Sequence, residues 1–390
     1  PILDYNAVSD RSVYDGQVSF DLNVTNVIRD APQISNFVGN GMVDANERFY
    51  GLEGDTIRAS SLIEWKRSEI SSYGVVSTLS LSVQGDAIYQ DTDNLNSSAN
   101  PLLSNDSIYR AMPAAMLEIR YPLIAQSEYA SHIFEPIAQI ITRPDETNIG
   151  EFANEDAQSL VFDTTNLFER DKFSGYDRVE GGTRANIGFR YSASFTNGAS
   201  VDVVAGQSFQ IAGDNSFAAT NDLVNAGEES GLETDKSDYV ASLQVNNGAG
   251  LTAGVGVRLD EQDLGLKRAD VSAKFVTPEY SFTTTYVFTE AQPNYRFDQD
   301  RHQIAGSGSL NIDENWRVFG SMTYDLESNQ RIAESVGLAY YNDCFSFAVS
   351  YANKNDRFTG ESTGQSINFA IGLRTIGDFD QTIDLGDDGF

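Results

Sequence analysis

The sequence predicts an all-β fold, an antiparallel transmembrane β-barrel of the outer-membrane type. Apolar and polar residues alternate along most of the chain, which is the pattern of a strand with one apolar and one polar face. Short and long connections between these segments also alternate, as in transmembrane barrels with brief turns at one end and extended loops at the other. Several segments approach the roughly nine to eleven residues that cross a bilayer at a tilt.

The composition narrows the class of protein. The 390 residues contain 26 Lys and Arg against 57 Asp and Glu, a formal net charge of −31. Nucleic acid is therefore a poor partner, because phosphate binding needs clustered basic side chains. No apolar run approaches the roughly 20 residues of a membrane-spanning helix, and helical periodicity is nearly absent. An acidic, aromatic, Gly-rich chain of alternating segments fits a β-solenoid or sandwich, or an outer-membrane barrel.

Taken in order, the alternating segments give about sixteen expected strands. Several are longer than the roughly five or six residues usual in soluble sheets and near the length that crosses a bilayer, which favours the barrel. The expected strands lie at 12–27, 56–69, 75–90, 113–121, 130–143, 179–195, 200–211, 238–246, 250–260, 267–276, 279–290, 301–312, 315–326, 331–341, 344–353 and 365–374.

The connections separate a barrel from a sandwich. Short connections rich in Gly, Asn, Asp and Pro are typical of tight hairpins, and longer loops lie between them. A sandwich has no reason to place every long loop at one end. The short connections are 71–74, 196–199, 246–249, 277–278, 312–315 and 342–343, and the long ones are 28–55, 91–112, 144–178 and 212–237, followed by 261–266, 291–300, 327–330 and 354–364.

The chain carries no recognisable catalytic or cofactor motif. Its two histidines, His132 and His302, fall in separate expected strands, and no nucleophile elbow, P-loop, H-E-x-x-H or C-x-x-C motif occurs. We therefore interpret the protein as non-catalytic, with no cofactor and no metal site. The acidic excess lies in the loops, where it indicates either ordinary solvation or binding of divalent cations.

The stretch from Ser131 to Phe195 combines a strand, a long acidic loop and a second strand. Its first strand contains Phe134-Glu135-Pro136 and Gln139. The candidate site residues lie in the loop and are Asn154, Glu155, Asp156, Asn166, Phe173, Ser174, Gly175, Asp177, Arg178 and Gly182, accompanied by Leu167, Phe168, Tyr176 and Glu180.

This stretch resembles the LptD family, the LPS-assembly proteins that form the outer-membrane lipopolysaccharide translocon. Asp343-Cys344, which opens the expected penultimate strand, is a second match, so the resemblance covers nearly the whole chain. It implies a barrel of about twenty-six strands. Residues 1–375 would then be the C-terminal part of the barrel and 376–390 a short acidic periplasmic tail. A periplasmic β-jellyroll and the first strands would precede them.

The resemblance also implies a location, a cargo and partners. The location is the outer membrane of a Gram-negative bacterium, in contact with outer-membrane lipids, and the cargo is lipopolysaccharide. The partners are an LptE-like lipoprotein plug inside the barrel and a periplasmic Lpt bridge of LptA-like proteins, which would reach the N-terminal domain. Cys344 would form an interdomain disulfide with that domain. Phe345 stands where the family often has a second cysteine, so the number of such disulfides stays open.

A lateral gate is the expected mechanism. Lipopolysaccharide sugars need a wet path and its acyl chains an apolar one, so a barrel whose first and last strands pair weakly could open sideways. The expected edge strand is 365–374, with the gate candidates Gln365, Ile367, Asn368, Phe369 and Gly372. The alternatives are a closed porin of about sixteen strands that passes small solutes, and a soluble β-rich adhesion or binding protein.

Overall fold

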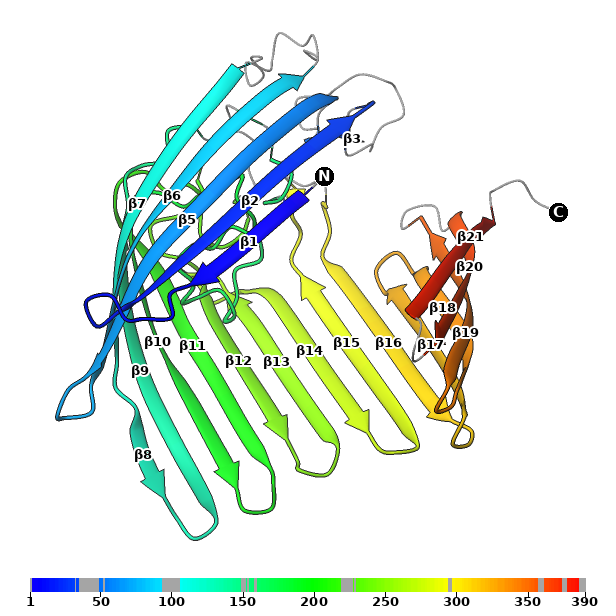
Figure 1. Ribbon diagram of the computed structural model, residues 1–390. Coiled ribbons are helices and arrows are strands. Elements are labelled where there is room, and N and C mark those ends of the chain that lie inside the picture. Colours follow the sequence, from blue (N-terminus) through cyan, green and yellow to red (C-terminus); the bar gives the residue numbers. More distant parts are fainter. Residues whose placement is uncertain are drawn as a thin grey trace.

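The computed structural model describes residues 2–31, 33–34, 49–51, 53–92, 106–148, 152, 154–157, 160–218, 227, 229–293, 297–356, 361–373 and 377–385. These residues form one curved antiparallel sheet of 19 strands and a small hairpin of two. Figure 1 shows the sheet as an unclosed wall. No described helix is long and apolar enough to cross a membrane.

The strands follow one another around the sheet in chain order, except that β8 pairs only with β9. The two edges are β1 and β21, which do not pair with each other in the described residues. The strands are β1 (Ile2–Val8), β2 (Gln17–Arg29), β5 (Gly54–Ile70), β6 (Val76–Thr92), β7 (Asp106–Arg120), β8 (Leu123–Gln126), β9 (Ala130–Thr142), β10 (Thr183–Phe195), β11 (Ser200–Ala212), β12 (Tyr239–Asn246), β13 (Leu251–Leu259), β14 (Leu266–Val276), β15 (Tyr280–Thr289), β16 (Arg301–Asn311), β17 (Trp316–Asp325), β18 (Gln330–Tyr341), β19 (Phe345–Asn355), β20 (Ser362–Leu373) and β21 (Gly377–Leu385), with β3 (Gln33–Ile34) and β4 (Phe49–Gly51) as the separate hairpin.

Each of the sixteen expected segments overlaps a strand of the sheet, so the period-two interpretation is confirmed, while β1, β8 and β21 were not predicted. The two faces are confirmed as well. Strand partners lie on the same face, and the rows of partners join large exposed apolar residues on what we call the outer face. Phe282 and Val336 belong to this face and are 52% and 58% exposed. The opposite, inner face carries small and polar residues such as Ser281, Ser309 and Ser335.

The C-terminal end differs from the prediction. Residues 377–385 form β21, which pairs with β20 from Gln365↔Leu385 to Leu373↔Gly377. The boundary that made 376–390 an acidic tail is therefore wrong for these residues, while 386–390 lie outside the described residues. Acidic residues at alternate positions, such as Asp378 and Asp380, hid a strand whose other positions include Phe379. The acidic charge of this segment indicated a solvated tail, although its alternating pattern is that of a strand.

The prediction that residues 365–374 form the edge strand is also wrong, because β21 lies beyond them. The gate candidates all lie in β20, which pairs with β19 on one side and with β21 on the other. Ile367, for example, lies opposite both Tyr351 and Ile383. The free edge in the described residues is therefore β21, and Gly372 lies one strand further in.

Tight turns define one end of the sheet and long connections the other. Gly74 and Gly198 have φ values of 83° and 85°, a backbone conformation that glycine adopts without steric cost. Both lie at the short-turn end. Cys344 lies at this same end between β18 and β19, where it is exposed and its N–H donates to Asn342 Oδ1 at 2.8 Å. The longest connection with a described fold, between β9 and β10, leaves from the opposite end.

Candidate functional site: a long loop folded onto the inner face

The connection from β9 to β10, residues 143–182, is called the inner loop, and its described residues fold against the inner face of the sheet. Its two ends meet in a neck. The N–H of Arg143 donates to the Gly182 carbonyl at 3.0 Å, and the N–H of Gly182 donates to the Pro144 carbonyl at 3.2 Å. Gly182 has a φ of 73°, and a Cβ there would lie 2.7 Å from the Ala212 carbonyl oxygen. The neck therefore requires glycine at this position.

The two halves of the predicted motif meet around Asp177. Its Oδ2 accepts the N–H groups of Glu155 at 2.6 Å and of Asp156 at 3.1 Å. Its Oδ1 accepts a hydrogen bond from Arg58 of β5, and Asp156 lies 2.8 Å from the same guanidinium. One arginine of the wall thus holds two carboxylates of the loop. Such charge-assisted contacts are stronger than those between neutral groups.

Asp156 also organises the turn that follows Phe173. Its two carboxylate oxygens accept the N–H groups of Tyr176 at 2.9 Å and of Asp177 at 3.0 Å. Ser174 Oγ donates to the Asp156 carbonyl at 3.1 Å. Gly175 has a φ of 70°, and a Cβ there would lie 2.2 Å from Asp156 Cγ. The Ser174–Asp177 turn therefore wraps a carboxylate that leaves no room for a side chain.

Arg110 of β7 makes the second contact between wall and loop. Its guanidinium lies 2.8 Å from Asp86 of β6 and 2.9 Å from Glu146 of the loop. It also donates to the carbonyl oxygens of Tyr176 and Asp177. The side chains of Arg110, Asp86 and Glu146 are at most 2% exposed. Because charges so deeply buried are costly unless paired, the three residues depend on one another.

A third ionic contact surrounds Glu180. This carboxylate is fully buried, 2.6 Å from Arg184 and 3.5 Å from Arg143. Burial by itself would raise its pKa, but the charges of Lys172, Arg143 and Arg184 outweigh burial and hold the pKa below its ordinary value. Burial lowers the pKa of Lys172 to about 8. Three cations therefore share one carboxylate beneath the loop.

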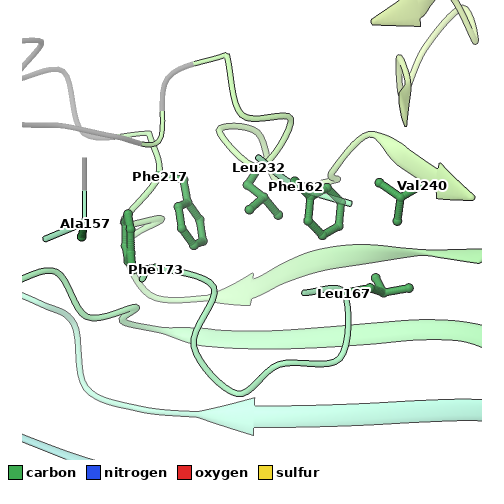
Figure 2. Close-up of a cluster of buried hydrophobic side chains, with 7 residues drawn as sticks. All are labelled: Ala157, Phe162, Leu167, Phe173, Phe217, Leu232 and Val240. Carbon is green, nitrogen blue, oxygen red and sulfur yellow. The ribbon is translucent and has the colours of Figure 1, made fainter. Parts of the chain in front are cut away.

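The inner loop has an apolar core of its own. Figure 2 shows Phe173 beside Phe217, whose ring centroids lie 4.6 Å apart. Contributions come from the loop, from the connection between β11 and β12, and from β12, so the cluster joins two connections to the wall. Its buried members are Ala157, Phe162, Leu167, Phe173, Phe217, Leu232 and Val240. Burying an aromatic or leucine side chain stabilises by about 1.5–3 kcal/mol, so the loop is folded by more than its charges.

Polar residues of the inner face complete the contact. Asn186 Nδ2 donates to Gln139 Oε1 at 2.6 Å, and Gln139 Nε2 donates to the Phe168 carbonyl at 3.0 Å. Lys172 Nζ donates to Asn186 Oδ1 at 3.3 Å. Gln139, noted in the sequence with Phe134-Glu135-Pro136, thus supports the loop from the strand before it.

The structure brings most of the predicted loop residues together. Asn154 shapes the turn before Asp156 by two 2.9 Å hydrogen bonds with the backbone of Ala157. Arg178 stacks on Phe152, 4.9 Å from the ring centroid, and donates to its carbonyl. Asn166 lies apart from the ionic contacts, in a separate turn where its Nδ2 donates to the Val161 carbonyl at 2.8 Å. The inward position itself was not predicted, since the loop was interpreted as extended at the surface.

The wall partners of the loop were also missed. Arg58 and Asp86 are charged residues inside alternating strands, which is the signal that could have identified them. Arg110 lies in the connection expected at 91–112, where β7 in fact begins at Asp106. A charge on a face of small polar residues needs a partner when buried. The two histidines each contact a tyrosine hydroxyl instead, His132 to Tyr191 at 2.9 Å and His302 to Tyr286 at 2.8 Å. No group of three potential metal ligands occurs in the described part of the chain.

Acidification should tighten the loop at Asp177. Burial, with the charge of Asp156, raises the pKa of Asp177 from 3.8 to about 6, although Arg58 opposes this. Because the folded loop takes up this proton first, the contribution of Asp177 to the free energy of unfolding increases as pH falls from about 6 to 3.8. Hydrogen exchange of the Glu155 and Asp156 amides across this range measures it. Asp177→Asn should flatten this pH dependence, and an unchanged slope in that variant would contradict the assignment.

An antiparallel sheet with an apolar outer face, a polar inner face and a long loop folded inward defines a protein of the outer-membrane β-barrel class. A mutant of the ferric enterobactin receptor PfeA of Pseudomonas aeruginosa shares the fold, with a TM-score of 0.51 at 10% identity over all of this chain and 65% of the receptor. A mutant porin of Rh. blastica aligns over 97% of this chain and all of its own, but its TM-score of 0.33 at 12% identity is too low to favour a porin.

The chain belongs to the LptD family, described as LPS transport system D, whose family model matches residues 1–316. The LPS-assembly protein LptD of Escherichia coli K12 is 23% identical over 327 residues, and that of Escherichia coli O1:K1 is 24% identical. Both alignments cover 74% of this chain and 40% of the relative, so the chain spans less than half of their length. The prediction that the protein is not an enzyme is confirmed by its family, which is described as a transport system.

Proposed function

We propose that this chain is the barrel part of an outer-membrane protein that transports lipopolysaccharide and assembles it in the outer leaflet of a Gram-negative bacterium. Membership of a family described as LPS transport system D carries this proposal. The two faces of the sheet support it, since an amphiphile needs both an apolar and a polar surface along its route. The proposed surroundings of the outer face are outer-membrane lipids.

The inner face supplies the polar route for the sugars. Hydroxyl groups line it between β15 and β18, where Ser281 and Ser309 lie 2.8 Å apart and Ser321 and Ser335 also 2.8 Å apart. Arg317 donates to Ser309 from the neighbouring strand. These groups can exchange hydrogen bonds with sugar hydroxyls in place of water. An LptE-like lipoprotein is the proposed plug on this side, together with the inner loop.

The acyl chains need an opening through the wall, and the proposed opening is at the edge of the sheet. β21 is the C-terminal edge strand, and β20 behind it contains Gln365, Ile367, Asn368, Phe369 and Gly372. We propose β21 as the strand that meets the first strand of the full-length barrel, since β21 pairs with β20 on one side only in the described residues. An edge that pairs weakly can separate and let lipid leave sideways.

A disulfide cross-link across the junction of β21 and the first barrel strand, which we call the seam, tests the proposal. A cysteine pair joining β21, for example at Gln381, to the first barrel strand of the full-length protein should stop the arrival of lipopolysaccharide at the cell surface. Reduction of the disulfide should restore arrival. The control places the pair between β18 and β19, at Ala339 and Ala348, which are already partners in the sheet. Transport that continues through a fully cross-linked seam would reject the gate.

The same protein would receive its cargo from the periplasm. A bridge of LptA-like proteins, docked on an N-terminal domain, is the proposed donor. Cys344 is exposed at the short-turn end, and short turns are periplasmic in outer-membrane barrels. Its proposed partner is a cysteine of that domain.

The disulfide of Cys344 can be measured directly. Non-reducing electrophoresis of the full-length protein should show a compact species that Cys344→Ser converts to a slower one, because the disulfide closes a long covalent loop. Ser346→Cys in the Cys344→Ser background is the matched control for position, two residues along the chain. Identical migration of the unaltered protein and Cys344→Ser would reject this pairing.

A further inference from the structure

The wall of the sheet is incomplete beside β7. This strand pairs with β6 along its whole length, from Gln90↔Asp106 to Val76↔Arg120. It pairs with β9 only from Ala115 to Arg120, because β9 ends at Thr142, opposite Ala115. No described strand pairs with the upper edge of β7, residues 106–114. The chain instead turns at Arg143 and Pro144 into the inner loop.

The residues of β7 fit this unpaired edge. Pro113 has no N–H to donate, and proline inside a strand is confined to edges and bulges. Ala115 is the next residue on the outer face, so β7 offers two small side chains on that face at the place where its partner is lost. The wall is consequently hollowed on its outer face. Behind the hollow, Arg110 binds Glu146 and the carbonyl of Tyr176, so the inner loop covers it from inside.

The hollow is a groove of about 770 Å³. Two rows of strand partners on the outer face form most of it. One row runs Val18, Trp65, Leu81, Ala115 and Thr142 across β2, β5, β6, β7 and β9, and the neighbouring row runs Ile63, Val83 and Pro113 before it stops at the free edge.

One wall of the groove is held in place. Trp65 Nε1 donates to the Val13 carbonyl at 2.7 Å, and the indole covers Gly16, where an added Cβ would lie 2.4 Å from Nε1. The indole therefore cannot swing across the groove without losing this hydrogen bond. A preformed groove costs a ligand less conformational ordering than one that must open.

We propose that this groove binds one acyl chain of a membrane lipid. It is continuous with the exposed outer face, where Ile63, Leu81 and Val83 are 52%, 47% and 49% exposed. Its volume lies in the range of about 300–1,000 Å³ typical of ligand sites with apolar linings. Four interstrand spacings of about 4.8 Å make the longer row roughly 19 Å long. Because transmembrane strands tilt by about 45°, a row across them runs obliquely through the bilayer and spans roughly 13 Å of depth, close to the roughly 15 Å of one leaflet.

The proposal rests on the outer face meeting lipid and not on the transport function. A lipid held here would cover the unpaired edge of β7 from outside, as the inner loop does from inside. An unpaired backbone edge is costly in hydrocarbon. An acyl chain has no hydrogen-bonding groups, so it does not satisfy the backbone groups of this edge. The acyl chain would exclude a second strand and fill the volume that Pro113 and Ala115 leave on the outer face.

Native mass spectrometry of the full-length protein, released from detergent with phosphatidylethanolamine added, tests the groove. The unaltered protein should retain one lipid, and Ala115→Trp, which fills the groove, should retain at least tenfold less. The control is Ala273→Trp. Ala273 lies on the same outer face in β14, half-buried like Ala115 and paired on both sides. That variant should retain the lipid. Equal retention by Ala115→Trp, or none by the unaltered protein, would overturn the proposal.

A second measurement needs no variant. A phosphatidylglycerol with a spin label on its acyl chain should show an immobilised component of about one lipid per protein in reconstituted membranes, beyond the mobile annular lipids. A spectrum with only the mobile component would overturn the proposal even if Ala115→Trp fails to insert. Loss of lipopolysaccharide transport with the immobilised component intact would instead count against the proposed function alone.

Discussion

Arg110→Met is expected to release the inner loop from the wall and open the inside of the barrel. The substitution keeps most of the apolar stem but leaves Asp86 and Glu146 buried without their cation. Removing one partner of a buried ion pair typically costs about 3–5 kcal/mol, because the remaining charge is uncompensated. Two carbonyls of the loop lose their donor as well. Arg110 is thus the cation of a fully buried contact that joins β6 and β7 to the loop.

The release can be measured in cells and in membranes. Cells that depend on the Arg110→Met protein should admit large antibiotics that the outer membrane normally excludes, and bilayers should show larger conductance steps. Proteolysis should cut within residues 143–182. Arg317→Met is the matched control, since Arg317 is an inner-face arginine that is exposed and bonded only to Ser309 among the contacts described. Wild-type permeability of the Arg110→Met protein would contradict the role of this contact.

Gly182→Ala is expected to disrupt the neck of the inner loop. Alanine at a φ of 73° is strained, and its Cβ would lie 2.7 Å from the backbone oxygen of Ala212. Strained backbone conformations cost about 1–3 kcal/mol each, and the backbone contact adds to this. The chain must shift, which breaks the hydrogen bonds that join Gly182 to Arg143 and Pro144. Because β10 begins at the next residue, the loss extends into the sheet.

This effect can be measured as the temperature at which the folded barrel unfolds in detergent, which is followed by the change in its mobility on a gel. The Gly182→Ala protein should unfold at a clearly lower temperature than the unaltered protein. Gly306→Ala, in β16, is the control because nothing lies within 4 Å of its added Cβ. If both variants unfold at the same temperature, the neck does not constrain the loop.

The strands could be predicted because period two is a local property of the sequence. Phe282 and Val336, for instance, alternate with polar neighbours in their own strands, and the structure places both on the outer face. β21 was missed because its alternating aspartates read as a solvated tail. Edge strands such as β1 are short and mostly exposed, so their patterns carry little burial signal.

The loop residues could be identified as a group, but not their partners. Asp156 and Asp177 lie 21 residues apart, and the resemblance joined them. Arg58 is 119 residues from Asp177, and only the register of β5, β6 and β7 brings it there. The sequence alone shows that Arg58 is charged, but it does not show that Arg58 lies close to Asp177. The inward fold of the loop likewise depends on pairing among strands that are far apart in the chain.

The most direct measurement of the central claim is pulse-labelling of lipopolysaccharide in cells depleted of the full-length protein. Newly made lipopolysaccharide should stop reaching the outer leaflet and accumulate inside the cell envelope, and re-expression should restore its arrival. The account would be contradicted if lipopolysaccharide kept arriving at the surface while uptake of small solutes fell, since that result describes a porin.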